Sequence, residues 1–232
     1  STRMIRIHQT DWTNRILNVY KPTGISSYDV VRRVKHVIKI KKVGHGGTLD
    51  PFGEGVLLIL IGQATKQMAQ LLNLPKTYEA ILKLGEATAS GDNTNPVVRT
   101  AEIPALTSTM LQEVATRFNG RIEQMPPVYS AKKINGKPAY LYARKGLPVT
   151  LRPSLINIYN LDLSLTDAST IFMHVTCSSG TYIRKLGEDI AQALGTEGHL
   201  TALKRTRIGD FSWENALPFD ELESLATEVP VR

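Results

Sequence analysis

A glycine-rich stretch from residue 44 to residue 55 carries the side chains of this sequence that are best placed to do chemistry. It contains His45 and Asp50 among five glycines and a proline. Because glycine has no side chain, a carboxylate on such a loop can approach a substrate closely. The stretch leads directly into Val56 to Ile61, an uninterrupted apolar run with the length of a buried strand. We therefore expect an acidic group on a loop that is attached to the protein core.

Several common motifs do not fit this stretch. Residues 44–49 depart from the dinucleotide-binding fingerprint, because Leu49 takes the place of the third glycine. The chain contains no Gly-Lys-Ser or Gly-Lys-Thr, so a P-loop is not indicated. His45-Gly46-Gly47 is similar to an oxyanion-hole sequence, but no Gly-x-Ser-x-Gly nucleophile elbow accompanies it. The five histidines show no metal-binding spacing, so the sequence indicates neither a metal nor a nucleotide cofactor.

The elements that must position the loop can be predicted from local patterns. Residues 16–20 predict a strand that ends at a proline–glycine turn over 21–24. Ser26 and Asp29 form a capping-box signature, and the helix that follows has apolar residues at helical spacing: Val30, Val31, Val34, Val37 and Ile38. Further helices are expected over 64–74, 111–118 and 183–194, strands over 78–84, 155–165 and 170–177, and a surface loop over 90–104. This irregular alternation favours a mixed α+β fold with a largely antiparallel sheet flanked by helices.

Composition bounds the class of protein. The chain has 232 residues, 42% of them hydrophobic, which is enough for a sizeable core. A single cysteine, Cys177, argues against a disulfide framework and fits the reducing cytoplasm, and the sequence has neither a long apolar run nor a signal-peptide pattern. The net charge of +7 makes polyanions plausible partners. Basic residues gather around 32–42 and 132–152, although solvated helix faces would also carry such charges.

Five motifs in the same order resemble those of the TruB family of tRNA pseudouridine synthases. They extend from about residue 16 to residue 222, so the resemblance covers most of the chain. The motifs are Lys21-Pro22-Thr23-Gly24-Ile25-Ser26-Ser27, Gly44-His45-Gly46-Gly47-Thr48-Leu49-Asp50-Pro51 with the run up to Lys66, Pro127-Val128-Tyr129-Ser130-Ala131-Lys132-Lys133 with Tyr140 to Arg144, Cys177-Ser178-Ser179-Gly180-Thr181-Tyr182-Ile183-Arg184, and His199-Leu200-x-x-Leu203-x-Arg205.

The resemblance implies a pseudouridine synthase fold and a tRNA pseudouridine synthase, an isomerase, that acts on the T-loop uridine conventionally numbered 55. It makes Asp50 the catalytic aspartate. The reaction breaks the bond from N1 to the ribose, turns the base over and forms a carbon–carbon bond at C5. It needs an ionised carboxylate and no cofactor or metal. Whether the carboxylate attacks the sugar or the base is left open.

The same resemblance assigns roles to further residues. Arg184 is expected to pair with Asp50, Tyr78 to stack on the flipped base, and Tyr182 and Leu203 to line the pocket. His45 is expected to enter the space that the base leaves, and Lys21 and Pro22 to lie at the pocket rim. Two basic groups would contact RNA phosphates and bind the T arm: Arg32, Arg33, Lys39, Lys41 and Lys42 in one, Lys132, Lys133 and Arg144 in the other.

The sequence also departs from the family pattern. Gly46 stands where a threonine is common, and Phe52-Gly53-Glu54 replaces a segment similar to Leu-Ala-Thr. The chain ends soon after Leu222, so we expect one catalytic domain over residues 1–232 with an acidic tail over about 210–232 and no PUA domain. We therefore expect no guide RNA and no obligatory protein partner, and we also expect a monomer. Two alternatives remain: a non-catalytic RNA-binding or tRNA-folding module of the same fold, and a synthase aimed at another RNA uridine.

Overall fold

The computed structural model of the chain describes residues 12–127, 133–134, 137–138 and 152–228. Within them the chain folds into two compact units. Unit 1 combines the chain up to Leu74 with the segment from Lys204 onward, and unit 2 runs from Pro75 to Leu203. Strand β12 (Gly198–Ile208) contributes residues to both units.

The sheet of unit 1 is built around the buried strand β3 (Glu54–Gly62). β1 (Asn14–Lys21) runs antiparallel to β3, and the short strand β2 (Val43–His45) pairs with β3 in the same sense. The end of β12 adds to β3 in parallel, while β13 (Phe211–Ser212) pairs with β12 and β14 (Leu217–Pro218) with β1. Every residue from Val56 to Ile61 has an exposed fraction of 0%, because both faces of β3 are covered.

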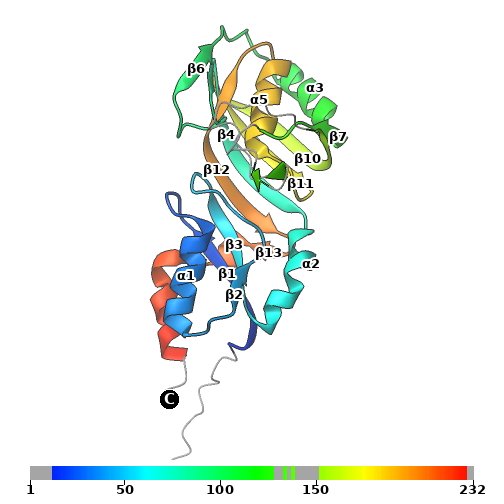
Figure 1. Cartoon of the computed structure of the whole chain (residues 1–232). Coiled ribbons are helices and arrows are strands. Elements are labelled where there is room, and N and C mark those ends of the chain that lie inside the picture. Colours follow the sequence, from blue (N-terminus) through cyan, green and yellow to red (C-terminus); the bar gives the residue numbers. More distant parts are fainter. Residues whose placement is uncertain (1–11, 128–132, 135–136, 139–151, 229–232) are drawn as a thin grey trace, which may run out of the picture. The chain divides into compact units, whose positions relative to one another are not determined.

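One face of β3 packs against helix α1 (Ser27–Ile38) and the 3-10 segment η3 (Phe219–Glu228), which lies beside α1 in Figure 1. The predicted capping box of α1 is confirmed: the Asp29 amide donates to Ser26 Oγ at 3.0 Å, and the Ser26 amide donates to Asp29 Oδ2 at 2.8 Å. The apolar residues predicted for this helix are all buried and meet Leu222 and Leu225 of η3 in the core. The other face of β3 packs against Ala64, Leu71 and Ile208.

The helix predicted over residues 64–74 is only partly right. The segment is divided into a 3-10 helix, η1 (Gln63–Gln67), and a short α-helix, α2 (Met68–Leu72). Another 3-10 turn, η2 (Trp213–Asn215), follows β13. Ala64 and Leu71 are buried, as the apolar spacing predicts. The spacing does not fix the type of helix, because a 3-10 helix, with three residues per turn, can bury the same residues.

Unit 2 contains an antiparallel sheet in the order β4-β11-β10-β7, with β12 next to β4. Its strands are β4 (Lys76–Leu84), β7 (Gly120–Gln124), β10 (Ser154–Asp167) and β11 (Thr170–Cys177). Two helices, α3 (Ser108–Phe118) and α5 (Ile183–Ala193), pack on this unit in Figure 1. Two small hairpins, β5 (Glu86–Thr88) with β6 (Val97–Thr100) and β8 (Lys133–Ile134) with β9 (Lys137–Pro138), complete the list.

The fold class predicted from sequence is confirmed: it is mixed α+β, with mostly antiparallel pairing in both units. Two local predictions were incomplete. The segment 90–104 is not wholly a surface loop, because it contains β6 and a fully buried Asp92. Strand β12 was not predicted at all, although it carries Leu203 and Arg205. None of the helices in the described ranges combines the length and apolar character needed to cross a membrane.

Candidate active site

Asp50 lies in unit 1 on a loop of residues 46–53, which we call the Asp50 loop, between β2 and β3. The loop begins where the Gly46 amide donates to the Leu58 carbonyl at 2.9 Å and closes where the Gly53 amide donates to the Asp50 carbonyl at 2.9 Å. Leu49 is buried, at 3% exposed, whereas Asp50 is half-buried. The loop therefore combines an anchored backbone with a half-buried acidic residue.

Lys21, predicted to lie at the pocket rim, is fully buried at 0% exposed. Its Nζ donates to the carbonyls of Pro22 at 2.7 Å and Ile25 at 2.8 Å. Burial lowers the pKa of Lys21 to about 8, and the negative charge of Asp50 opposes this shift more than any other group does. Lys21 therefore holds the Pro22 and Ile25 carbonyls and interacts electrostatically with Asp50. Its contact with substrate stays a prediction.

His45 is the last residue of β2 and directly precedes the Asp50 loop. Burial lowers the pKa of His45, and the positive charge of Arg205 adds to that effect. The imidazole is consequently neutral at physiological pH. Its Nδ1 is buried, and no atom of the described residues forms a hydrogen bond with it.

Two residues that depart from the family pattern, Gly46 and Glu54, have local explanations. A Cβ at Gly46 would lie 3.2 Å from Leu71 Cβ and 3.3 Å from Leu60 Cδ1, so a side chain here would crowd the core. Glu54, which begins β3, accepts a hydrogen bond from the Tyr20 hydroxyl at 2.8 Å. The first departure thus avoids a clash in the core, and the second links the start of β3 to β1.

Arg184 lies in unit 2 in the first turn of α5, where its Nη1 donates to Asp92 Oδ2 at 2.7 Å. Asp92 is 1% exposed and also accepts hydrogen bonds from Ser90 and Thr94. Burial alone would raise the pKa of Asp92, but the hydrogen bonds from Thr94, Arg184 and Ser90 outweigh it and lower the pKa. Asp92 is thus a charged, fully bonded carboxylate that orients the Arg184 guanidinium. Pairing of Arg184 with Asp50 stays a prediction.

The remaining predicted pocket residues also belong to unit 2. Tyr78 lies in β4 opposite Val175 of β11 and is half-buried. Tyr182 precedes α5, and its main chain is held by Gln124: the Tyr182 amide donates to Gln124 Oε1 at 2.8 Å, and Gln124 Nε2 donates to the Tyr182 carbonyl at 3.1 Å. Leu203 lies in β12 and is 8% exposed. The roles of these three side chains toward substrate stay predictions.

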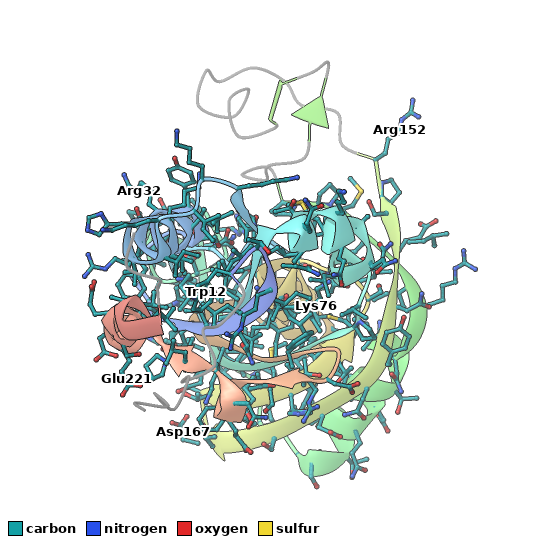
Figure 2. All side chains as sticks on the ribbon, turned by 90° about the horizontal axis from the view of Figure 1, so that it is seen from below. Trp12, Arg32, Lys76, Arg152, Asp167 and Glu221 are labelled. Carbon is teal, nitrogen blue, oxygen red and sulfur yellow. The ribbon has the colours of Figure 1, made fainter. Side chains whose placement is uncertain are left out.

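The basic residues predicted to contact RNA differ in their present partners. Arg32 binds Asp29 one helical turn away, and Arg33 binds Glu223 of η3. Figure 2 shows Arg32 on the outer side of α1, with Glu221 exposed on the acidic η3 next to it. Exposed lysines follow the end of α1: Lys39, Lys41 and Lys42. Lys132, Arg144 and the side chain of Lys133 lie outside the described residues.

Two buried charged residues, one in each unit, were not singled out from the sequence. Arg205 was quoted only as part of a motif, but it is 2% exposed and donates three hydrogen bonds to carbonyls around the Asp50 loop. Asp92 lay in a segment interpreted as a surface loop. The one sequence signal for Asp92 was the run Ser90-Gly91-Asp92-Asn93-Thr94, whose polar residues typically bond their own backbone. Within the described ranges, no three His, Cys, Asp or Glu side chains are grouped so that they could hold a metal ion.

The family matches define the class of the chain as a pseudouridylate synthase, an isomerase. The family model of the TruB family pseudouridylate synthase N-terminal domain matches residues 35–183, and that of the tRNA pseudouridylate synthase B C-terminal domain matches residues 184–229. The chain belongs to the TruB family, which confirms the resemblance seen in the sequence.

Individual relatives agree with this assignment. The chain is 44% identical to the tRNA pseudouridine synthase B of Bordetella avium over 90% of this chain and 87% of the relative. It is 42% identical to the enzyme of that name from Caldanaerobacter subterraneus over 92% and 75% of the two chains. Among solved structures, it is similar to a chain in a Cbf5-Nop10-Gar1 complex, with a TM-score of 0.71 and 28% identity over 92% of this chain. This chain spans only 54% of that protein's length.

Proposed function

We propose that this protein isomerises a uridine of tRNA, the T-loop uridine at position 55, to pseudouridine, with Asp50 as the catalytic group. One observation carries the proposal: the half-buried Asp50 stands on a loop whose backbone is held by Ser27 on one side and by Arg205 on the other. Relatives that share more than 40% of its residues bear the name tRNA pseudouridine synthase B, which supports tRNA as the substrate.

One carboxylate is sufficient for this reaction. The glycosidic bond between N1 and C1′ breaks, a bond between C5 and C1′ forms, C5 loses its proton and N1 gains one, so atoms and charge balance without a redox partner. The carboxylate of Asp50 acts as the nucleophile, and attack on C1′ or on the base is compatible with one carboxylate. Its positioning supplies the rate advantage, because a held nucleophile reacts with a bound substrate as if it were unimolecular.

The substrate uridine must leave its stack before it reaches Asp50. Unstacking costs on the order of a few kcal/mol. Stacking on the half-buried Tyr78 returns about 1–3 kcal/mol of that cost. His45 fills the space that the base leaves, and its neutral imidazole suits that role because a neutral ring loses less hydration than a charged one.

Contacts with RNA phosphates in this proposal come chiefly from the exposed lysines after α1. Arg32 and Arg33 already bind carboxylates, and each would have to exchange a partner to bind a phosphate. Lys39, Lys41 and Lys42 have no described ion pair. Neutralising phosphates releases counterions from the RNA, which supplies affinity that does not depend on sequence. In this proposal these lysines bind the T arm of the tRNA.

Asp50→Asn tests the assignment. Release of tritium from tRNA labelled at uridine C5 should fall by at least about 1,000-fold in this variant, because the amide is neither a nucleophile nor a base. Binding of the tRNA should persist within a few-fold. Asp210→Asn, which changes an exposed aspartate of unit 1, is the matched control and should retain normal turnover.

The position of the product is tested separately. Mass spectrometry after cyanoethylation of an unmodified tRNA transcript should report one pseudouridine at position 55 and none in a transcript with cytidine there. Normal tritium release by Asp50→Asn would exclude Asp50 as the catalytic group. Pseudouridine at another position would retain the enzyme but exclude the proposed substrate site.

A further inference from the structure

Arg205 lies in unit 1 on β12, far along the chain from the Asp50 loop but in contact with it. Its Nη2 donates to the Gly47 carbonyl at 2.9 Å and its Nη1 to the Thr48 carbonyl at 3.1 Å. Its Nε donates to the Val56 carbonyl at 2.9 Å. One guanidinium therefore binds the chain on both sides of Asp50.

The opposite side of the loop is held by the turn that opens α1. Ser27 Oγ donates to the Leu49 carbonyl and accepts from the Leu49 amide, both at 2.9 Å. The Gly24 amide donates to the Pro51 carbonyl at 2.8 Å. The two residues that flank Asp50 are thus bonded to the α1 turn, and the two before them to Arg205.

Burying the charged guanidinium of Arg205 costs free energy of desolvation. The side chain is 2% exposed, and among the described residues its hydrogen-bond acceptors are main-chain carbonyls, with no carboxylate. A buried cation whose described hydrogen-bond acceptors are neutral carbonyls loses hydration that these carbonyls restore only in part. A methionine or leucine would fill a similar volume without that cost. Core packing alone therefore gives no reason for an arginine at this position.

The backbone around Arg205 is built for the same approach. Arg205 stands opposite Gly55 in the parallel pairing of β12 with β3. Gly55 has a φ of 114°, and a Cβ there would lie 2.1 Å from the Arg205 carbonyl oxygen. This close approach of the two strands brings the guanidinium under the Asp50 loop. The positive charge of Arg205 also helps to lower the pKa of both Lys21 and His45.

We propose that Arg205 is a positioning residue for the isomerisation, which acts by fixing the backbone of the Asp50 loop against Ser27 so that the carboxylate keeps its productive orientation. The inference rests on the proposed catalytic role of Asp50. It assigns Arg205 no contact with the RNA. Five N–H donors in a fixed planar fork suit this task, because they can bind several carbonyls at once in one geometry.

Arg205→Lys and Arg205→Met test the proposal in the full chain. The lysine keeps the charge with one donor atom, and the methionine keeps only the apolar stem. In single-turnover assays on tRNA transcript the rate should fall on the order of 100-fold for methionine and less for lysine, because small displacements of a reacting group cost about that much. The dissociation constant for tRNA should stay within about twofold, since neither variant alters a group that binds RNA.

Hydrogen exchange provides a local readout of the same effect. Peptides covering residues 46–53 should exchange faster in Arg205→Met, because the amides of Leu49 and Gly53 depend on the loop geometry. Peptides covering β3 and α1 should keep the protection of the parent protein. Arg207→Met, two residues along the same strand but exposed, should change neither the rate nor the exchange.

A comparison with Val34→Ala separates positioning from loss of stability. Val34 is fully buried in the α1 core, so this variant loses stability without touching the Asp50 loop, and it should keep the single-turnover rate. If Arg205→Met does not fold, Ser27→Ala carries the test, since it removes the opposite anchor and should also lower the rate with unchanged affinity. A parental rate in a folded Arg205→Met or Ser27→Ala would overturn the proposal.

The outcome is distinguishable from failure of the proposed function. An active Asp50→Asn would remove the catalytic role of Asp50 and with it the purpose of the anchors. An inactive Asp50→Asn together with a fully active Arg205→Met would leave the catalytic role in place and overturn the positioning role alone. Equal losses of rate in Arg205→Met and Val34→Ala at equal stability would also overturn it, because the effect would then be structural.

Discussion

The buried ammonium of Lys21 makes the stability of this protein depend on pH. Burial lowers the pKa of Lys21 from 10.5 to about 8 in the folded protein, and the charge of Asp50 only partly offsets it. An unfolded lysine keeps its proton up to about pH 10.5. Between these two values the unfolded chain holds a proton that the folded chain has released, so the free energy of unfolding rises with pH. Lys21→Met should remove this rise.

The magnitude follows from the two pKa values. They differ by about 2.5, and each pKa unit corresponds to about 1.4 kcal/mol, so the full effect is about 3 kcal/mol. Linkage places about 2.5 kcal/mol of it between pH 7 and pH 10, with little change below pH 7 where both states are protonated. The free energy of unfolding of the parent protein, minus that of Lys21→Met, should therefore grow by this amount across that range.

Urea unfolding at intervals between pH 7 and pH 10 measures the effect. Taking the difference between parent and variant cancels every other titrating group that the two proteins share. Lys41→Met, which removes an exposed lysine of the same unit, is the control and should give a constant difference across the range. A constant difference for Lys21→Met as well would refute the argument, because the lysine would then have the same proton affinity in the folded and unfolded states.

Three further outcomes are expected. Burial raises the pKa of the Cys177 thiol to about 11. Above about pH 9 the thiol is therefore ionised in the unfolded chain but not in the folded chain, so the free energy of unfolding falls as pH rises. Cys177→Ala should remove this loss, which is about 1 kcal/mol between pH 8 and pH 10 in urea unfolding. Asp92→Asn should lower the single-turnover rate on the order of tenfold with tRNA affinity retained, because Arg184 loses its ion pair with Asp92. Gly55→Ala should destabilise the protein by roughly 3 kcal/mol or more in thermal unfolding, since its Cβ would lie 2.1 Å from a carbonyl oxygen of β12, whereas Gly120→Ala, with nothing within 4 Å, should cost about 1 kcal/mol.

Elements with strong local signals were predictable from the sequence. Ser26 and Asp29 predict the start of helix α1, and valines at helical spacing predict its buried face. Strand β3 is apolar over six consecutive residues, Val56 to Ile61, as expected of a strand covered on both faces. In these segments the interactions that decide the structure lie within a few residues, so the order of side chains is enough to predict them.

Elements stabilised from a distance were missed. Strand β12 includes Lys204, Arg205 and Arg207, so its apolar pattern is interrupted by charges. What makes it a strand is its pairing with partners such as β3, in parallel, and the space that Gly55 leaves for it. Similarly, β6 lies in a segment rich in Asn, Thr and Pro and forms because β5 is available as a partner.

The candidate site divides in the same way. The sequence by itself identified the family. It also led to the proposal of Asp50 as the catalytic group, because this reaction requires a carboxylate and a carboxylate is recognisable from the residue type. Only the tertiary structure revealed that Arg205 binds the Asp50 loop across a separation of 157 residues to Thr48. Its acceptors are main-chain carbonyl oxygens, which every residue possesses. No residue type marks such an acceptor, so the contact becomes visible only when the folded backbone brings these oxygens within reach of the guanidinium.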